Sequence, residues 1–261
     1  MPTFAKDCLK GKAILITGGL GAIGRVAVSR LLEHSAKVAV NDLLDPGPAP
    51  GVVEQLGWPR GRCTYLQADV TSAHAATAVV AGTLEAFGRI DAALCHAGIV
   101  YSGPILDCQP QDWDKMMSVN VRSALLVAQA AARSMIERAV PGRIIFTSSW
   151  VQDVPWPGIT PYTVTKSAIK MLMRGMSREL AGHGVRVNAV APGIVAAGMA
   201  KRQWDTEPDY RRRAEKAIPL GYLQPAESVA DALVFLCSDA SDYMTGATLL
   251  VDGGCSLYPM D

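Results

Sequence analysis

The chain has 261 residues, of which 49% are hydrophobic, and its charged residues leave a formal net charge of +1. Such a small net charge gives no bias toward nucleic acid or an anionic membrane surface, so we expect neither as a partner. No apolar run reaches the roughly 18 residues of a membrane-spanning helix. The N-terminal apolar stretch at 13–16 is too short for the core of a signal peptide.

Six cysteines are spread along the chain, and none forms a CxxC pair or lies beside histidines at metal-ligand spacing. Cysteines within apolar runs behave as small hydrophobic side chains. The sequence therefore predicts reduced thiols, no metal site and a cytoplasmic location.

Short apolar runs alternate with longer stretches of helical periodicity along the whole chain. The runs predict strands at 13–17, 37–42, 64–68, 91–95, 143–148, 186–191 and 248–252. The stretches between them predict helices at 23–34, 72–87, 111–139, 161–183 and 226–239. Most runs are apolar on both faces, which is typical of parallel strands covered by helices on both sides. The sequence therefore predicts a single α/β domain over 1–261 with a doubly wound, seven-stranded parallel sheet.

The first predicted strand runs into a glycine-rich loop, Gly18-Gly19-Leu20-Gly21-Ala22-Ile23-Gly24, and a helix follows. Glycines allow the backbone to approach a pyrophosphate closely, and the helix N-terminus offers free N–H groups to the anion. An ordinary glycine turn is the alternative, but the strand–loop–helix order is the context that a dinucleotide-binding loop requires. We therefore predict that the nucleotide is held by Gly18, Gly21, Ala22, Ile23 and Gly24.

Asp42 ends the second predicted strand, eighteen residues after Gly24. A carboxylate at this place accepts hydrogen bonds from the ribose hydroxyls of NAD and repels the 2′-phosphate of NADP. Leu43 and Leu44 follow it, and no basic residue precedes Arg25 in the glycine loop. We therefore predict NAD as the cofactor, with an exposed capping role as the alternative for Asp42.

Two features follow in the next part of the chain. Proline and glycine crowd the stretch 45–51, which predicts a loop after the second strand. Asp69 closes the third predicted strand and is followed by Val70. Asp69 either holds the edge of the adenine, with Val70 packed on the ring, or caps the helix that follows.

Tyr162 and Lys166 lie four residues apart at the start of a predicted helix, with Thr160 as its N-cap and Pro161 in its first turn. A phenol has a pKa of about 10, and a neighbouring ammonium lowers it. Tyr162 would then exchange a proton with an alcohol while hydride moves to or from a nicotinamide. A pair on the surface of a helix is the alternative interpretation.

Ser148 and Ser149 lie at the end of the strand predicted at 143–148. Ligands bind beyond the carboxyl ends of strands in parallel α/β sheets. A serine hydroxyl there would hold the substrate oxygen in position for transfer. A serine that caps the end of the strand is the alternative.

The chain resembles the short-chain dehydrogenase/reductase family over essentially its whole length. The matching motifs are Thr17–Gly24, Asp69, Ala97-Gly98, Asn120, Ser149, Tyr162-x-x-x-Lys166, Pro192-Gly193, Thr245-Gly246 and Val251-Asp252-Gly253-Gly254. The family separates its serine and tyrosine by thirteen residues, which favours Ser149 over Ser148. The resemblance implies a Rossmann fold and a catalytic tetrad. Tyr162 is its acid/base, Lys166 lowers the tyrosine pKa and holds the nicotinamide ribose, Ser149 orients the substrate, and Asn120 holds a water in a proton relay.

The resemblance also implies a set of further contacts with the cofactor. These residues are Leu43, Val70, Ala97, Gly98, Pro192, Gly193 and Val195, together with Tyr162 and Lys166. Three positions depart from the family's pattern: Ala22 and His96 replace a glycine and an asparagine, and Ala197 replaces a threonine that contacts the nicotinamide amide. We interpret His96 as structural rather than catalytic, since no carboxylate partner is evident.

The substrate pocket is expected to involve Ser149, Val151, Trp156, Tyr162 and Gly193. It is also expected to involve a flap at about 194–223, a stretch that interrupts the strand–helix alternation. Further candidates are Gln152 and Asp153 for hydroxyl groups and Trp150, Trp156 and Trp204 for a ring, with a place in the core or an interface as the tryptophans' alternative.

We expect a sugar or another cyclic, polyhydroxylated secondary alcohol as the substrate. An NADPH-dependent 3-oxoacyl-thioester reductase and a nucleotide-binding regulator or scaffold are the alternatives. The resemblance implies a homotetramer. The helices at 111–139 and 161–183 favour an interface because they carry apolar residues on more than one side, namely Leu125, Leu126, Val127, Met135, Ile169, Met171, Leu172 and Met173.

Overall fold

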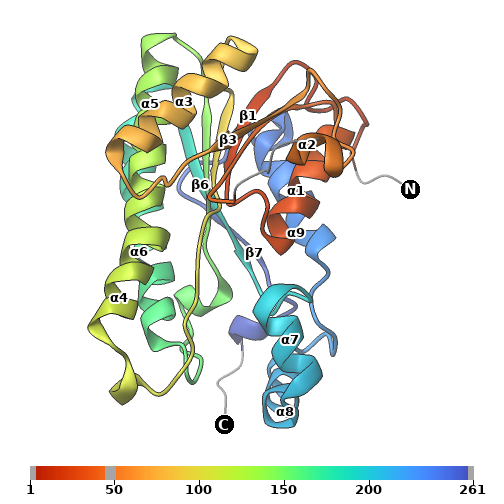
Figure 1. Cartoon of the computed structure of the whole chain (residues 1–261), viewed down its shortest axis with the longest axis vertical. Coiled ribbons are helices and arrows are strands. Elements are labelled where there is room, and N and C mark those ends of the chain that lie inside the picture. The colour runs from red at the N-terminus through yellow and green to blue at the C-terminus, as the bar shows by residue number, and fades with distance from the viewer. Residues whose placement is uncertain (1–3, 45–50, 258–261) are drawn as a thin grey trace.

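The computed structural model describes residues 4–44 and 51–257, so most of the loop predicted at 45–51 lies outside the described residues. Within these ranges, seven parallel strands form one sheet in the order β3-β2-β1-β4-β5-β6-β7 (Figure 1). The strands are β1 (Ala13–Thr17), β2 (Lys37–Asp42), β3 (Cys63–Gln67), β4 (Ala92–Cys95), β5 (Arg143–Thr147), β6 (Arg186–Pro192) and β7 (Thr248–Val251). The predicted doubly wound sheet is confirmed, with strand ends shifted by a residue in places.

Helices cover both faces of this sheet (Figure 1). On one face, α1 (Ala22–Glu33) packs against α9 (Ala226–Cys237). On the other face lie α3 (Ala73–Phe87), α5 (Ser123–Glu137) and α6 (Thr160–Leu180). The shorter helices are α2 (Val52–Gln55), α4 (Pro110–Met116), α7 (Gly198–Thr206) and α8 (Pro208–Ala217).

The strands are apolar throughout because each contributes to two cores. In β1, Ile14 and Ile16 pack in the core beneath α1 and α9, whereas Leu15 packs in the core beneath α3 and α5. All three side chains are fully buried. Successive side chains of a strand point to opposite faces, so a sheet covered on both sides needs apolar residues at every position.

The same burial corrects part of the interface prediction. Val127, Met135, Ile169 and Met173 lie at most 2% exposed in the chain's own core, so they are no surplus available to a partner. Met171 differs, since it is 64% exposed on α6.

The helix predicted at 111–139 is interrupted by one π-helical turn, Met117–Arg122, between α4 and α5. Asn120 lies in this turn and is 2% exposed. A hydrophobic period does not reveal such a turn, which adds a residue to one helical repeat and is frequent at functional sites.

The start of α6 differs from the predicted cap. Ile159, not Thr160, is the N-cap, and no side chain caps this end. Thr160 is already helical, and Pro161 takes the second helical position, where the missing N–H costs little.

The segment at 194–223 contains α7 and α8, and its two ends meet. Val195 forms an isolated bridge with Gln224. The Gln224 side chain also accepts a hydrogen bond of 2.8 Å from the Gly193 N–H. Both helices are therefore anchored at the carboxyl end of β6.

The described part of the chain contains no helix long and apolar enough to cross a membrane. All six cysteines are free.

Candidate active site

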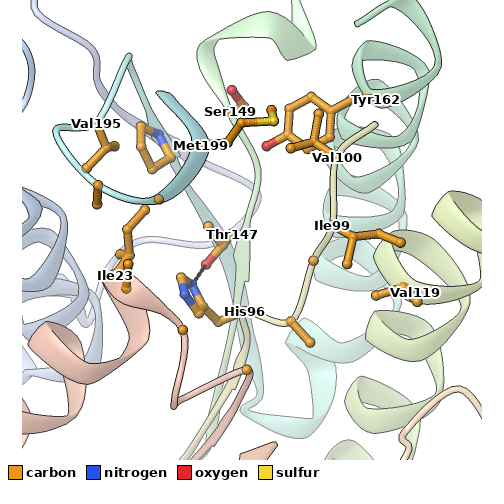
Figure 2. Close-up of a pocket in the computed structure, with 18 of the residues that line it drawn as sticks. Ile23, His96, Ile99, Val100, Val119, Thr147, Ser149, Tyr162, Val195 and Met199 are labelled. Atoms are coloured by element: carbon orange, nitrogen blue, oxygen red, sulfur yellow. Dashed lines mark hydrogen bonds between the residues drawn. The ribbon is translucent and has the colours of Figure 1, made fainter. Parts of the chain in front are cut away.

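A cavity of about 690 Å³ opens along the carboxyl ends of the central strands. Its size falls within the roughly 300–1,000 Å³ usual for small-molecule sites. Figure 2 shows Ser149, Tyr162 and Met199 together at one end of it, and His96 with Ile23 at the other. The cavity therefore joins the glycine loop to the residues predicted to react.

The loop glycines serve different purposes. Gly18 has a φ of +67°, and a Cβ on Gly24 would lie 2.4 Å from the Gly18 carbonyl oxygen, so both positions require glycine for the loop itself. At Gly21, the N-cap of α1, a Cβ would meet only that same oxygen, at 3.3 Å. The missing side chain at Gly21 therefore opens space above the N-terminus of α1, where an anion is favoured.

The Asp42 carboxylate lies at the end of β2 and braces the glycine loop. Its Oδ2 accepts from the Leu20 N–H at 2.9 Å, and its Oδ1 accepts from the Leu43 N–H at 2.8 Å. It is half-buried and lines the cavity. Among the described residues that line the cavity, Lys166 is the only lysine or arginine, so a phosphate beside Asp42 would find no cation there.

Asp69 does not cap the next helix. Ser72 is the N-cap of α3, and its hydroxyl accepts from the Ala75 N–H. Asp69 instead accepts from the N–H and hydroxyl of Thr71 and lines the cavity, as Val70 does.

Tyr162, Lys166 and Ser149 converge on the cavity from α6 and from the residue just beyond β5. The Tyr162 hydroxyl points away from α6 into the cavity, on the side where Ser149 lies (Figure 2). The Lys166 amine donates to the Thr147 carbonyl at 2.8 Å and lies 5.3 Å from the centre of the Tyr162 ring. Ser148 also lines the cavity, but its hydroxyl is engaged elsewhere, since it donates to the Lys166 carbonyl.

The sequence predicts a lowered pKa for the Tyr162 phenol, whereas in this structure that pKa is raised. Burial raises the pKa of Tyr162 to about 12, and the hydrogen bond with Ser149 only partly opposes this. Burial likewise lowers the pKa of Lys166 from 10.5 to about 8. Desolvation disfavours the charged form of each group, and it is the largest cause of both shifts.

Asn120 lies behind the cavity wall rather than in it. Its amide accepts from the Ile99 N–H at 2.8 Å and donates to the Ile99 carbonyl at 2.9 Å and to the Thr165 hydroxyl at 3.0 Å. The π-helical turn thus fastens the loop that follows β4 to α6 next to Lys166.

His96 stands where the family has an asparagine. It contacts residues at the ends of two strands, β1 and β5. Its Nδ1 lies 3.0 Å from the Thr147 hydroxyl (Figure 2), and its backbone N–H donates to Thr17 at 3.1 Å. Burial, together with the charge of Lys166, lowers the pKa of His96 to about 4, so the ring is neutral at pH 7. These bonds fit the structural interpretation of His96, although the ring also lines the cavity.

The end of the cavity beyond Ser149 and Tyr162 is mostly apolar. Its walls come from the loops that follow β4 and β5, the start of α6 and the 194–223 segment. They include Val100, Trp150, Val151, Trp156, Ile159, Ile194, Met199 and Ala200. Only Gln203 and Tyr210 add polar side-chain groups from the 194–223 segment.

Three predicted contacts lie outside this lining. Gln152 is buried outside the cavity wall, and Asp153 forms an ion pair with Lys170 at 2.6 Å. Trp204 stacks against Arg211 instead, with 5.5 Å between the guanidinium and the ring centre.

Every residue predicted to hold the cofactor lines the cavity except Gly24. Gly24 instead packs against the backbone of the glycine loop, at Gly18 and Gly19. The cavity also contains the five residues first expected to form the substrate pocket, whereas the further candidates Gln152, Asp153 and Trp204 lie outside it. Sequence reasoning did not single out Thr147, Met199 or Tyr210. For Met199 and Tyr210 the available signal was helical spacing within 194–223.

Comparisons with known proteins agree with this geometry. A family model described as enoyl-(acyl carrier protein) reductase matches residues 19–256. The 3beta-hydroxysteroid dehydrogenase 1 of Eggerthella lenta is 32% identical over 253 residues, covering 97% of each chain. The L-rhamnose 1-dehydrogenase (NAD(P)(+)) of a Sphingomonas species is 35% identical over 246 residues, covering 94% of this chain and 96% of the relative.

A solved structure gives the same result for the fold. A short-chain type dehydrogenase/reductase from Mycobacterium marinum superposes with a TM-score of 0.87 at 32% identity, covering 96% of this chain and 97% of that one.

Proposed function

The chain belongs to the short-chain dehydrogenase/reductase family of oxidoreductases that act on CH–OH groups, and we propose that it transfers hydride between a secondary alcohol and NAD. One observation carries the proposal. A phenol, an ammonium and a hydroxyl, from Tyr162, Lys166 and Ser149, face one cavity that also contains a glycine loop at a helix N-terminus.

NAD fits the residues of this cavity. The open space above Gly21 suits a pyrophosphate, and the Asp42 carboxylate suits ribose hydroxyls rather than a phosphate. The segment 45–50, which follows Asp42 closely in the sequence, adds no lysine or arginine. When bound, NAD supplies the hydride acceptor in one direction and, reduced, the hydride donor in the other.

The chain's own residues would move the proton. Ser149 holds the alcohol oxygen, and Tyr162 takes the alcohol proton as hydride departs; in reverse, Tyr162 returns it to the forming alkoxide. Lys166, fixed by Thr147, stabilises the phenolate and, as the family resemblance implies, holds the nicotinamide ribose. Asn120 keeps this wall in place through Thr165 and takes part in the relay that the resemblance implies.

The lining of the cavity favours an apolar cyclic alcohol over the sugar expected from sequence. A sugar presents several hydroxyls that need partners, and unpaired polar groups are costly in a buried site. Here the walls are aliphatic and aromatic, and Gln152 and Asp153 lie outside them. Names of relatives span both classes, since one is a steroid dehydrogenase and another acts on L-rhamnose.

We also propose a homotetramer, as the resemblance implies. The apolar side chains left exposed on two elements support an interface, with Met171 on α6 at 64% and Leu250 on β7 at 44%. Light scattering after size-exclusion chromatography tests it: a mass of four chains supports the assembly, and a monomer overturns it.

The proposed reaction is tested by following the absorbance of reduced nicotinamide while the protein is incubated with cyclic alcohols, polyols and sugars. NAD and NADP are supplied in separate series. We expect NADH to form with apolar cyclic alcohols. A higher kcat/KM with NADP would overturn the cofactor assignment. Silence across the panel, with NAD still bound, would favour a nucleotide-binding regulator instead.

A further inference from the structure

Tyr210 on α8 places a buried phenol in the wall of the cavity. Its side chain is 7% exposed, and the residue lines the cavity together with Met199 and Ala200. Among the residues that the structure describes, none forms a hydrogen bond with its hydroxyl. The hydroxyl oxygen is open to the cavity rather than enclosed by protein, so a polar group of a ligand in the cavity would be its hydrogen-bond partner.

Packing holds the ring of Tyr210 without help from its hydroxyl. The ring meets Trp156 edge to face, with 6.2 Å between ring centres, and Trp156 meets Trp150 in the same manner at 5.3 Å. Ala214 and Ile218 complete the same apolar cluster. A phenylalanine would fill this place equally well, so packing alone does not account for the hydroxyl.

Gln203 supplies a second polar group from the same segment. It lies on α7, is half-buried and lines the cavity. Its Nε2 lies 3.4 Å from Glu207, a long contact, and no hydrogen bond to its Oε1 occurs within the described ranges. Tyr210 and Gln203 are the polar side chains that α8 and α7 give to the cavity, whereas Tyr162 comes from α6 and Ser149 from the turn that follows β5. Figure 1 shows α8 well apart from α6.

We infer that Tyr210, assisted by Gln203, hydrogen-bonds a second oxygen of the substrate, remote from the carbon that reacts. The substrate class is then a mainly apolar ring compound with two polar ends. A secondary alcohol or ketone faces Tyr162, and a hydroxyl or carbonyl faces Tyr210. This inference rests on the proposed function and narrows its substrate.

Two bicyclic substrates that differ in one oxygen test the inference. The first is a decalin with a single secondary hydroxyl, and the second is the decalin diol with hydroxyls at opposite ends. They are compared in wild type, in Tyr210→Phe, which removes only the hydroxyl, and in Tyr243→Phe, a matched change at a fully exposed tyrosine. Steady-state kinetics with NAD give kcat and KM. Product inhibition of alcohol oxidation by the matching ketones gives the inhibition constants of these ketones.

Wild type is expected to favour the diol in kcat/KM by roughly five- to tenfold, mostly through KM, as one neutral hydrogen bond provides. Tyr210→Phe should lose this preference, weaken binding of the two-ended ketone by the same factor and leave the monoalcohol within about twofold. Tyr243→Phe should match wild type on both substrates.

Three results would overturn the inference alone while the monoalcohol is still oxidised. They are no preference in wild type, no loss in Tyr210→Phe, or equal losses on both substrates. Failure of wild type to oxidise either decalin would instead overturn the proposed reaction on apolar cyclic alcohols, and this inference with it.

Discussion

Replacement of Lys166 by methionine should make the protein more stable at pH 7 while it removes activity. Lys166 is 4% exposed, and burial lowers its pKa from 10.5 to about 8. At about 1.4 kcal/mol per pH unit, this difference means that the buried charge costs the fold roughly 3 kcal/mol at pH 7. Methionine also loses the hydrogen bond to Thr147, worth about 1 kcal/mol. The expected net gain is about 2 kcal/mol, or roughly 4–8 °C in Tm.

The contribution of Lys166 to stability depends on pH in a defined direction. The unfolded chain keeps the ordinary pKa of 10.5, so between pH 8 and 10.5 the unfolded state binds more protons than the folded state. Stability contributed by Lys166 therefore rises with pH across this window in wild type, and the rise is absent without the amine. The advantage of Lys166→Met should shrink from pH 8 upward, and above pH 10.5 the variant should be about 1 kcal/mol less stable than wild type, because only the lost hydrogen bond to Thr147 then remains.

Urea and thermal unfolding at several pH values measure both effects. Lys170→Met is the matched control, because Lys170 lies on the same helix but is partly exposed and paired with Asp153. That control should change stability by less than about 1 kcal/mol. The reasoning is refuted if Lys166→Met is less stable than wild type at pH 7. It is also refuted if the difference in unfolding free energy between Lys166→Met and wild type stays constant from pH 8 to 10.5.

Four other substitutions have defined outcomes. Gly24→Ala, whose Cβ would lie 2.4 Å from a loop carbonyl, should lower both Tm and NADH affinity. Gly21→Ala, whose Cβ would lie 3.3 Å from the same oxygen, should lower Tm much less and weaken NADH binding in a fluorescence titration; equal Tm losses would contradict the division. Asp42→Asn should raise the ratio of kcat/KM for NADP over NAD by at least about tenfold, and an unchanged ratio would remove Asp42 from cofactor choice. Asn120→Ala removes three hydrogen bonds and should cost roughly 2–4 kcal/mol in urea unfolding; a loss below about 1 kcal/mol would show that they contribute little.

Much of the fold was predictable because its signals are local. Runs such as β1 are apolar on both faces, which only a sheet covered on both sides explains. The meeting of Ser149, Tyr162 and Lys166 in one cavity was predictable for a similar reason. One lies just past the end of a central strand, and the other two share a face of the next helix.

What escaped prediction depends on three-dimensional surroundings. The π-helical turn at Asn120 follows from bonds to Ile99 and Thr165, which are distant in sequence. The raised pKa of Tyr162 follows from burial, whereas the sequence displays only the neighbouring charge of Lys166. Asp153 was expected to face the substrate, and its ion pair with Lys170 lies outside the cavity wall.

The most direct test of the account is Tyr162→Phe, with turnover and NADH binding measured on the same preparation. Loss of one phenolic oxygen should lower kcat for alcohol oxidation by at least about a hundredfold. The dissociation constant of NADH, from fluorescence titration, should remain within about threefold of wild type. A variant that binds NADH normally and keeps more than a tenth of wild-type turnover would contradict proton transfer through Tyr162.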